Sequence, residues 1–222
     1  RGNDGLTWSE AEEIHLPISA VNYGHGISLF EDTSGRLWLA WSARAKGSFP
    51  SQIWVSTKGN ASAPWPTPSQ VTRTEEWHEG YRMYDCWNPA FAELNGTVWL
   101  HWMSNRNYQK GWIWRSGSRD GGVTWSEPSM MENSPSYQAF LQTSDGSLWL
   151  GGTDYENGER VWVTGSHDFG RNWSEKKVLG VGAFPRISQV GNRICVTWQS
   201  NRYSPIVKET ALHGANGQPY IW

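Results

Sequence analysis

Three arginines follow three tryptophan-rich segments of this sequence, two of them at the same register and the third, Arg44, one residue nearer to its tryptophan. They are Arg44 in SARAKGSFP (42–50), Arg106 in SNRNYQKG (104–111) and Arg202 in SNRYSP (200–205). A guanidinium group binds a carboxylate through two parallel, charge-assisted hydrogen bonds, so converging arginines would form a carboxylate-binding site. A repeated arginine at a repeated position also fits a structural role, in which each guanidinium group binds a neighbouring carbonyl group.

The segment RTEEWHEGYRMYDCW (73–87) gathers further ionisable side chains. It contains Glu79, Tyr81, Arg82, Tyr84 and Asp85. Carboxylates and tyrosines can transfer protons or act as nucleophiles in enzymes. These charges could instead form a solvated flap, and Asp85, which directly precedes an expected strand, could be a cap.

The elements that would position these side chains are repeated along the chain. Tryptophan occurs 17 times, and three stretches share one template: GRLWLAW (35–41), GTVWLHW (96–102) and GSLWLGG (146–152). A fourth, NRICVTW (192–198), keeps the register with Cys195 at the tryptophan position. Alternating, aromatic-rich runs that open on a turn residue predict β-strands after tight turns.

A second repeated motif has the form S-x-D-x-G-x-x-W. SRDGGVTW (118–125) and SHDFGRNW (166–173) are full copies, and GNDGLTW (2–8) is a third with Asn3 at the aspartate position. The two motifs recur at a nearly constant offset, 29 residues from Gly96 to Trp125 and 27 from Gly146 to Trp173, and each unit predicts four strands. No helical periodicity of sufficient length is present. The sequence therefore predicts an all-β fold, a β-propeller of four-stranded antiparallel blades.

The second motif resembles the Asp box of the sialidase-like (BNR repeat) propellers, and the resemblance covers nearly the whole chain. It implies a structural role for Asp120 and Asp168, on the face opposite the ligand site, because Asp and Ser bind the backbone of turns. A calcium site is the alternative, but it needs more oxygen ligands than one aspartate and a hydroxyl provide.

The resemblance also implies a site in which three arginines hold a substrate carboxylate, a glutamate activates a tyrosine nucleophile, and an aspartate is the acid/base. The positions that offer these residue types are Arg44, Arg106, Arg202, Glu79, Tyr81 or Tyr84, and Asp85. Arg82 and Asp154 are further substrate-binding candidates; Asp154 lies in TDYENGE (153–159), where the third unit lacks the arginine. The chain lacks the Arg-Ile-Pro motif of the family, but Arg186 lies on an expected inner strand, where alternate side chains face the central channel.

We expect one propeller domain over residues 1–222. Its parts are the fourth strand of a split blade (1–21), three blades (22–72, 73–131 and 132–179) and strands one to three of the last blade (180–222). The split blade could close a four-bladed ring, which we favour slightly. The alternative is a piece of a larger, for example six-bladed, propeller, which would expose sheet edges and apolar faces.

Binding without catalysis is the rival function. Trp41, Trp102 and Trp198 end the tryptophan-rich strands near the expected ligand face, and aromatic rings stack well on sugars. A protein-interaction scaffold is a third possibility, because propellers carry many functions. We therefore predict a carbohydrate-recognising propeller, with hydrolysis of acidic glycans as its possible activity.

Composition limits the partners. The net charge of −2 argues against a nucleic-acid partner, and no apolar run approaches the length of a membrane-spanning helix. The six histidines and two cysteines show no metal-ligand spacing, so we predict no metal and no cofactor. The chain begins with Arg and looks like a mature or excised piece, and we expect a secreted or cell-surface protein with a glycan ligand.

Overall fold

The computed structural model describes residues 10–15, 20–45, 50–73, 77–78, 81–82, 85–104, 111–131, 137–199 and 212–213. All regular elements in these ranges are β-strands, as the sequence predicts. None of the described segments forms a helix long and apolar enough to cross a membrane.

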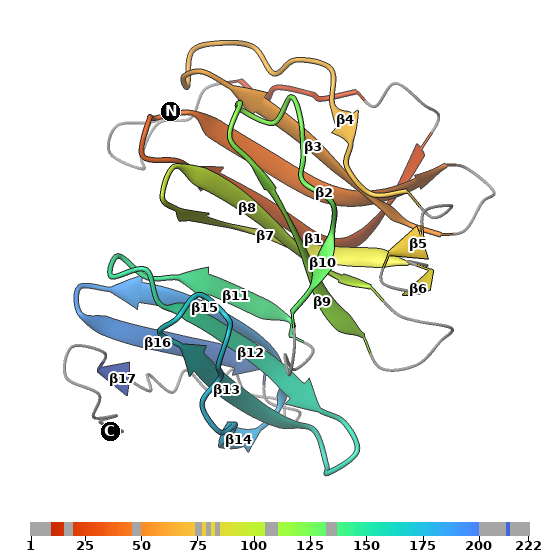
Figure 1. Cartoon of the computed structure of the whole chain (residues 1–222). Coiled ribbons are helices and arrows are strands. Elements are labelled where there is room, and N and C mark those ends of the chain that lie inside the picture. Colours follow the sequence, from red (N-terminus) through yellow and green to blue (C-terminus); the bar gives the residue numbers. More distant parts are fainter. Residues whose placement is uncertain are drawn as a thin grey trace.

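Four antiparallel sheets follow one another along the chain (Figure 1), and we call them blades 1 to 4. Blade 1 contains β1 (Ala20–Glu31), β2 (Leu37–Ala45), β3 (Gln52–Lys58) and β4 (Ser69–Gln70). Blade 2 contains β7 (Cys86–Leu94), β8 (Thr97–Ser104), β9 (Trp112–Ser118) and β10 (Ser129–Met130). Blade 3 contains β11 (Ala139–Gln142), β12 (Leu148–Asp154), β13 (Arg160–Ser166) and β14 (Lys177–Val181).

Blade 4 contains β15 (Ala183–Val190), β16 (Arg193–Gln199) and β17 (Leu212–His213). A separate two-stranded ribbon, β5 (Trp77–His78) and β6 (Tyr81–Arg82), lies between blades 1 and 2 in the sequence. In every blade the predicted tryptophan-rich segment forms the second strand, and the strand before it is the first or inner strand.

Tight turns join the inner and second strands. In blade 2 the turn is Asn95-Gly96, and both residues have positive φ, 51° and 69°. Asn-Gly is the preferred pair for a two-residue hairpin turn, because its backbone twist matches that of the flanking strands. This turn sets the register in which Leu94 pairs with Thr97 and Phe91 with Leu100.

The two full copies of the aspartate motif are turns held by their own side chains. The carboxylate of Asp120 accepts hydrogen bonds from the backbone N–H of Val123 at 3.1 Å and of Thr124 at 2.9 Å, and from the hydroxyl of Ser118 at 2.9 Å. Asp168 repeats this pattern with Arg171, Asn172 and Ser166. These contacts are local, which agrees with the structural role predicted for both aspartates.

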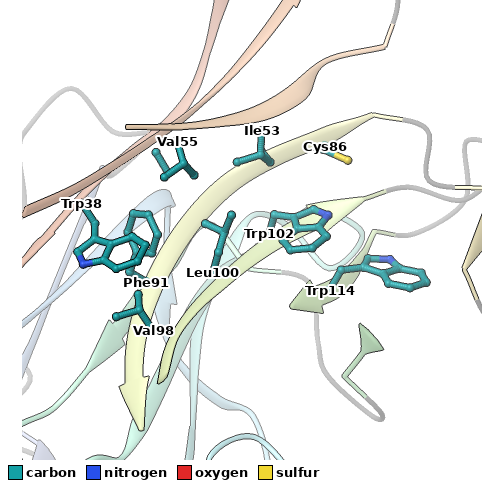
Figure 2. Packing of buried hydrophobic residues seen from close by; sticks show 10 residues of the cluster. Trp38, Ile53, Val55, Cys86, Phe91, Val98, Leu100, Trp102 and Trp114 are labelled. Carbon is teal, nitrogen blue, oxygen red and sulfur yellow. The ribbon is translucent and has the colours of Figure 1, made fainter. Parts of the chain in front are cut away.

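The hydrophobic core is divided into clusters that lie between neighbouring blades. In the cluster between blades 1 and 2, the buried side chains of Trp38, Ile53 and Val55 pack against the sheet of blade 2. Figure 2 shows them beside Phe91, Leu100 and Trp102. Similar clusters join blade 2 to blade 3 and blade 3 to blade 4. Apolar packing therefore joins each of these blades to its neighbour.

The inner strands pack in the order β1, β7, β11 and β15. The described residues show no comparable packing of β15 on β1, which a closed four-bladed ring requires. Ile27 and Leu29 of β1 are 67% and 66% exposed, and Phe184 and Val190 of β15 are 54% and 62% exposed. The all-β architecture of four-stranded sheets is thus confirmed, whereas the blade number and ring closure stay predictions.

Candidate functional site

A cavity of about 1090 Å³ lies where the inner strands of the four blades converge. Each inner strand, or the residues just before it, contributes to the wall: 26–28, 87–90, 137–140, and 184 with 186–187. The end of β12 and the turn after it form one side of the cavity with residues 152–157. Because this turn joins the second and third strands of blade 3, it lies on the face where the sequence places the ligand site.

An irregularity recurs on the inner strands beside the cavity. The equivalent residues Ser28, Ala90 and Arg186 are each preceded, two positions earlier, by a residue with positive φ. These residues are Gly26 (85°), Asn88 (50°) and Phe184 (56°). The pairing register shifts at each of these places, as in a β-bulge. A side chain at position 26 would approach Asn88 Cα to 2.9 Å, so this position requires glycine.

Tyr137 occupies the equivalent place in blade 3 and joins blades 2 and 3. Its hydroxyl donates to the carbonyl oxygen of Asn88 at 2.6 Å, and the Asn88 amide nitrogen donates to the Tyr137 carbonyl oxygen at 3.2 Å. Burial raises the pKa of Tyr137, so its phenol stays protonated and remains a donor. The positive φ of Asn88, which is costly outside glycine, is held by these two bonds.

Charged groups line the cavity at β12, β15 and the segment before β14. Among the described residues of the wall, the cations are Arg186 and Lys176 and the carboxylates are Asp154 and Glu156. The Arg186 side chain is exposed, and its Nη1 donates to the Pro185 carbonyl oxygen at 3.1 Å. Lys176 Nζ lies 4.4 Å from the centre of the Trp162 ring, which is a cation–π contact.

Asp154, a predicted substrate-binding residue, lies in the cavity wall, where its carboxylate holds a turn. It accepts hydrogen bonds from the side-chain amide of Asn157 at 2.7 Å and from the backbone N–H of Glu156 at 3.1 Å and of Asn157 at 3.2 Å. The bond from the Asn157 side chain is the largest cause that lowers the pKa of Asp154, with a further contribution from Lys176. Asp154 is therefore an ionised turn residue and a poor proton donor.

Two residues that the sequence analysis did not single out also shape the wall. Gln138 Nε2 donates to the hydroxyl of Tyr155 at 2.9 Å, and the Thr153 hydroxyl donates to Gln138 Oε1 at 2.7 Å. The only sequence feature that pointed to Tyr155 was that its segment, TDYENGE (153–159), lacks the arginine found in the other three units. Gln138 carried no signal, because its role depends on the pairing of β11 with β12.

The three tryptophans predicted to bind ligand are core residues, which corrects that prediction. Trp41, Trp102 and Trp198 are 8%, 0% and 8% exposed and belong to hydrophobic clusters. Trp41 pairs across strands with Trp54, and the Trp198 indole N–H donates to the Val181 carbonyl oxygen at 3.1 Å. Their rings face neighbouring strands and blades, so they offer little surface to a sugar.

Asp85 and Arg44 lie outside the cavity wall. The Asp85 carboxylate accepts the backbone N–H of Ser51 at 2.6 Å, and the N–H of Cys86 donates to the Ser51 carbonyl oxygen at 2.9 Å. Asp85 thus links the start of β7 to blade 1, which is the capping role weighed against catalysis. Arg44 is half-buried near the end of β2.

The remaining predicted residues are described only in part or not at all. Tyr81 and Arg82 form β6, where they pair with His78 and Trp77, and their side chains lie outside the described atoms. Glu79, Tyr84, Arg106 and Arg202 lie outside the described residues. The structure therefore assembles no catalytic set from the predicted residues that it describes. No group of three or more His, Cys, Asp or Glu in the described part could hold a metal ion.

Comparison with known proteins assigns the family. The model of the BNR repeat-like domain matches residues 40–199, which is most of the chain. The chain belongs to the BNR repeat-like domain family. A comparison with curated proteins found no match.

Solved structures with a similar fold include carbohydrate-active enzymes. The Hadza microbial sialidase Hz136 has a TM-score of 0.57 and 18% identity, over 80% of this chain and 42% of the sialidase. The GH43_1 enzyme from Xanthomonas citri has a TM-score of 0.61 and 16% identity, over 86% of this chain and 74% of the enzyme. Zg3597, a family 117 glycoside hydrolase from Zobellia galactanivorans, has a TM-score of 0.65 and 8% identity, over 95% of this chain and 72% of the hydrolase. This BNR repeat-like chain thus shares the fold of these enzymes and spans less than half the length of the sialidase.

Proposed function

We propose that this BNR repeat-like chain is a carbohydrate-active protein that binds an acidic glycan in its central cavity. The observation that carries the proposal is the placement of the exposed Arg186 in a large cavity between the inner strands. A guanidinium group in a concave site is suited to a sugar carboxylate, and the aromatic wall suits the apolar face of a sugar ring. The likeness to a sialidase and to glycoside hydrolases supports a carbohydrate ligand.

The described polar residues of the cavity wall are better suited to binding a glycan than to hydrolysing it. Asp154 has its carboxylate engaged by the turn and its pKa lowered, which suits an electrostatic role better than proton donation. Hydrolysis is the second candidate function, and it would need a nucleophile and an acid from Glu79, Tyr81 and Tyr84. In this proposal Arg82, Arg106 and Arg202 remain candidate carboxylate ligands, whereas Arg44 lies outside the cavity wall. The protein is secreted or at the cell surface, where glycans are accessible.

Calorimetric titration with a matched ligand pair tests the binding proposal. We expect the protein to bind sialyllactose more tightly than lactose, because only the former carries a carboxylate for Arg186. Arg186→Gln should weaken sialyllactose binding by about tenfold or more, which is the usual scale for a charged hydrogen bond, and should leave lactose binding unchanged. Arg193→Gln is the matched control, since Arg193 is an exposed arginine of the same blade outside the cavity wall.

Equal affinity for sialyllactose and lactose, or an Arg186→Gln variant that binds sialyllactose normally, would contradict the acidic-glycan proposal. Fluorogenic glycosides, including a sialoside, test hydrolysis separately. Turnover that Tyr81→Phe or Glu79→Gln abolishes would establish the enzyme, and binding without turnover would establish a lectin-like protein.

A further inference from the structure

Tyr155 is an exposed aromatic residue with a fixed hydroxyl group. It begins the turn after β12, lines the cavity and is 53% exposed. Its hydroxyl oxygen accepts the hydrogen bond from Gln138 Nε2 at 2.9 Å. An exposed tyrosine gains little from burial, and holding it in one rotamer costs conformational entropy. Its fixed position therefore needs a reason other than core packing.

Gln138 can hold Tyr155 because Gln138 is itself held at both ends. Its backbone N–H donates to the Gly151 carbonyl oxygen at 2.7 Å, and its Oε1 accepts the Thr153 hydroxyl at 2.7 Å. Since the amide oxygen is engaged by Thr153, the amide nitrogen is the end that faces the phenol. Hydrogen bonds thus run in one direction, from Thr153 to Gln138 to Tyr155, and the phenolic proton of Tyr155 is left to donate away from the wall.

The turn itself does not need Tyr155. The carboxylate of Asp154 already binds the backbone N–H groups of Glu156 and Asn157, which closes the turn. The contact between Tyr155 and Gln138 instead determines where the ring and its hydroxyl are presented to the cavity.

We propose that Tyr155 is a glycan-binding residue of the cavity and that Gln138 positions it. The ring covers the apolar face of a pyranose, and the phenolic O–H donates to a sugar oxygen, a combination for which tyrosine is well suited. Tyr155 recognises a neutral sugar unit, whereas Arg186 recognises the carboxylate. This inference rests on the proposed function and adds to it a second recognition element.

The test measures binding of sialyllactose and xylotriose by calorimetry. Tyr155→Phe keeps the ring and removes the donor, so we expect an affinity loss of about fivefold to tenfold for whichever probe binds. Tyr155→Ala removes both and should lose about 100-fold, since the apolar contact is lost as well. Gln138→Met should give a loss no larger than that of Tyr155→Phe, because the ring and its hydroxyl remain but the hydroxyl is no longer held. Val123→Ala, an exposed site in the turn between β9 and β10, is the control.

A double-variant cycle separates positioning from a general effect on the fold. If Gln138 acts through the phenol, Gln138→Met in the Tyr155→Phe background should cause no further loss, and all variants should unfold at the wild-type temperature. Wild-type protein that binds neither probe would refute the proposed function. Wild-type binding that Tyr155→Phe and Tyr155→Ala leave within about twofold would refute the role of Tyr155 alone. Losses that track a lowered unfolding temperature would also overturn it.

Discussion

Asp120 and Asp168 show how one carboxylate can organise a whole turn. The pKa of each carboxyl is lowered to about 2. The largest cause is a hydrogen bond, from the Thr124 hydroxyl to Asp120 and from the Asn172 backbone N–H to Asp168. Both carboxylates are thus stabilised in the ionised form by hydrogen bonds within eight-residue motifs. The hydrogen bonds that close these turns are therefore the same ones that keep both carboxylates ionised.

The lowered pKa values predict an acid-dependent stability. A carboxylate with a pKa of about 2 in the folded state and 3.8 in the unfolded state stabilises the fold above pH 3.8. This contribution is lost as the pH falls from about 4 to about 2. The Asp120→Asn, Asp168→Asn double variant should be less stable than wild type at pH 7, and the difference should shrink towards pH 2. Urea unfolding at several pH values measures it, with Glu175→Gln as control. A constant difference across this range would contradict the hydrogen-bond account.

At the scale of elements, one repeat position is buried in one blade and exposed in another. Leu29, Phe91, Phe140 and Ile187 each pair with the equivalent residue of the second strand. Phe91 is 4% exposed and packs against Trp38 of blade 1, with ring centres 5.8 Å apart. Among the described residues no blade precedes the one that contains Leu29, and Leu29 is 66% exposed. The neighbouring blade therefore decides whether this position belongs to the core.

Truncation at this position should have unequal costs. Phe91→Ala should destabilise the protein by about 3–5 kcal/mol, because it removes a buried ring and leaves a cavity between blades 1 and 2. Leu29→Ala should cost less than about 1 kcal/mol, because the leucine buries little surface. Equilibrium urea unfolding of both variants tests the difference. Equal losses would show that Leu29 is covered in solution and would favour closure of the ring.

At the scale of the whole molecule, stability depends on contacts between successive blades. Three hydrophobic clusters each join two neighbouring blades, so the blades support one another in sequence order, as in other repeat proteins. The two cysteines lie in different environments within this arrangement. Cys86 is fully buried between blades 1 and 2, whereas Cys195 is half-buried on β16. Burial raises the pKa of the Cys86 thiol to about 12.

Thiol labelling should separate these two environments. The thiolate is the reactive form, so Cys86 should react with a disulfide reagent only when blades 1 and 2 separate. We expect one thiol to react readily in the native protein and the second at a rate set by unfolding. Cys195→Ser should remove the fast phase and retain the slow one. A fast phase that persists in Cys195→Ser would show that the interface between blades 1 and 2 opens without global unfolding.

The sequence by itself determined the strands, the tight turns, the repeat and the family resemblance. Alternating apolar residues and turn chemistry act over a few neighbouring residues, so Asn95-Gly96 and the Asp120 turn could be predicted locally. The same pattern could not show that Trp102 is buried or that Asp85 binds the backbone of blade 1, because these outcomes depend on contacts between blades. Only the tertiary structure brought Gln138 to Tyr155 and placed Arg186 in the cavity. Strand register and interblade packing fix these neighbours, and both join residues far apart in the chain.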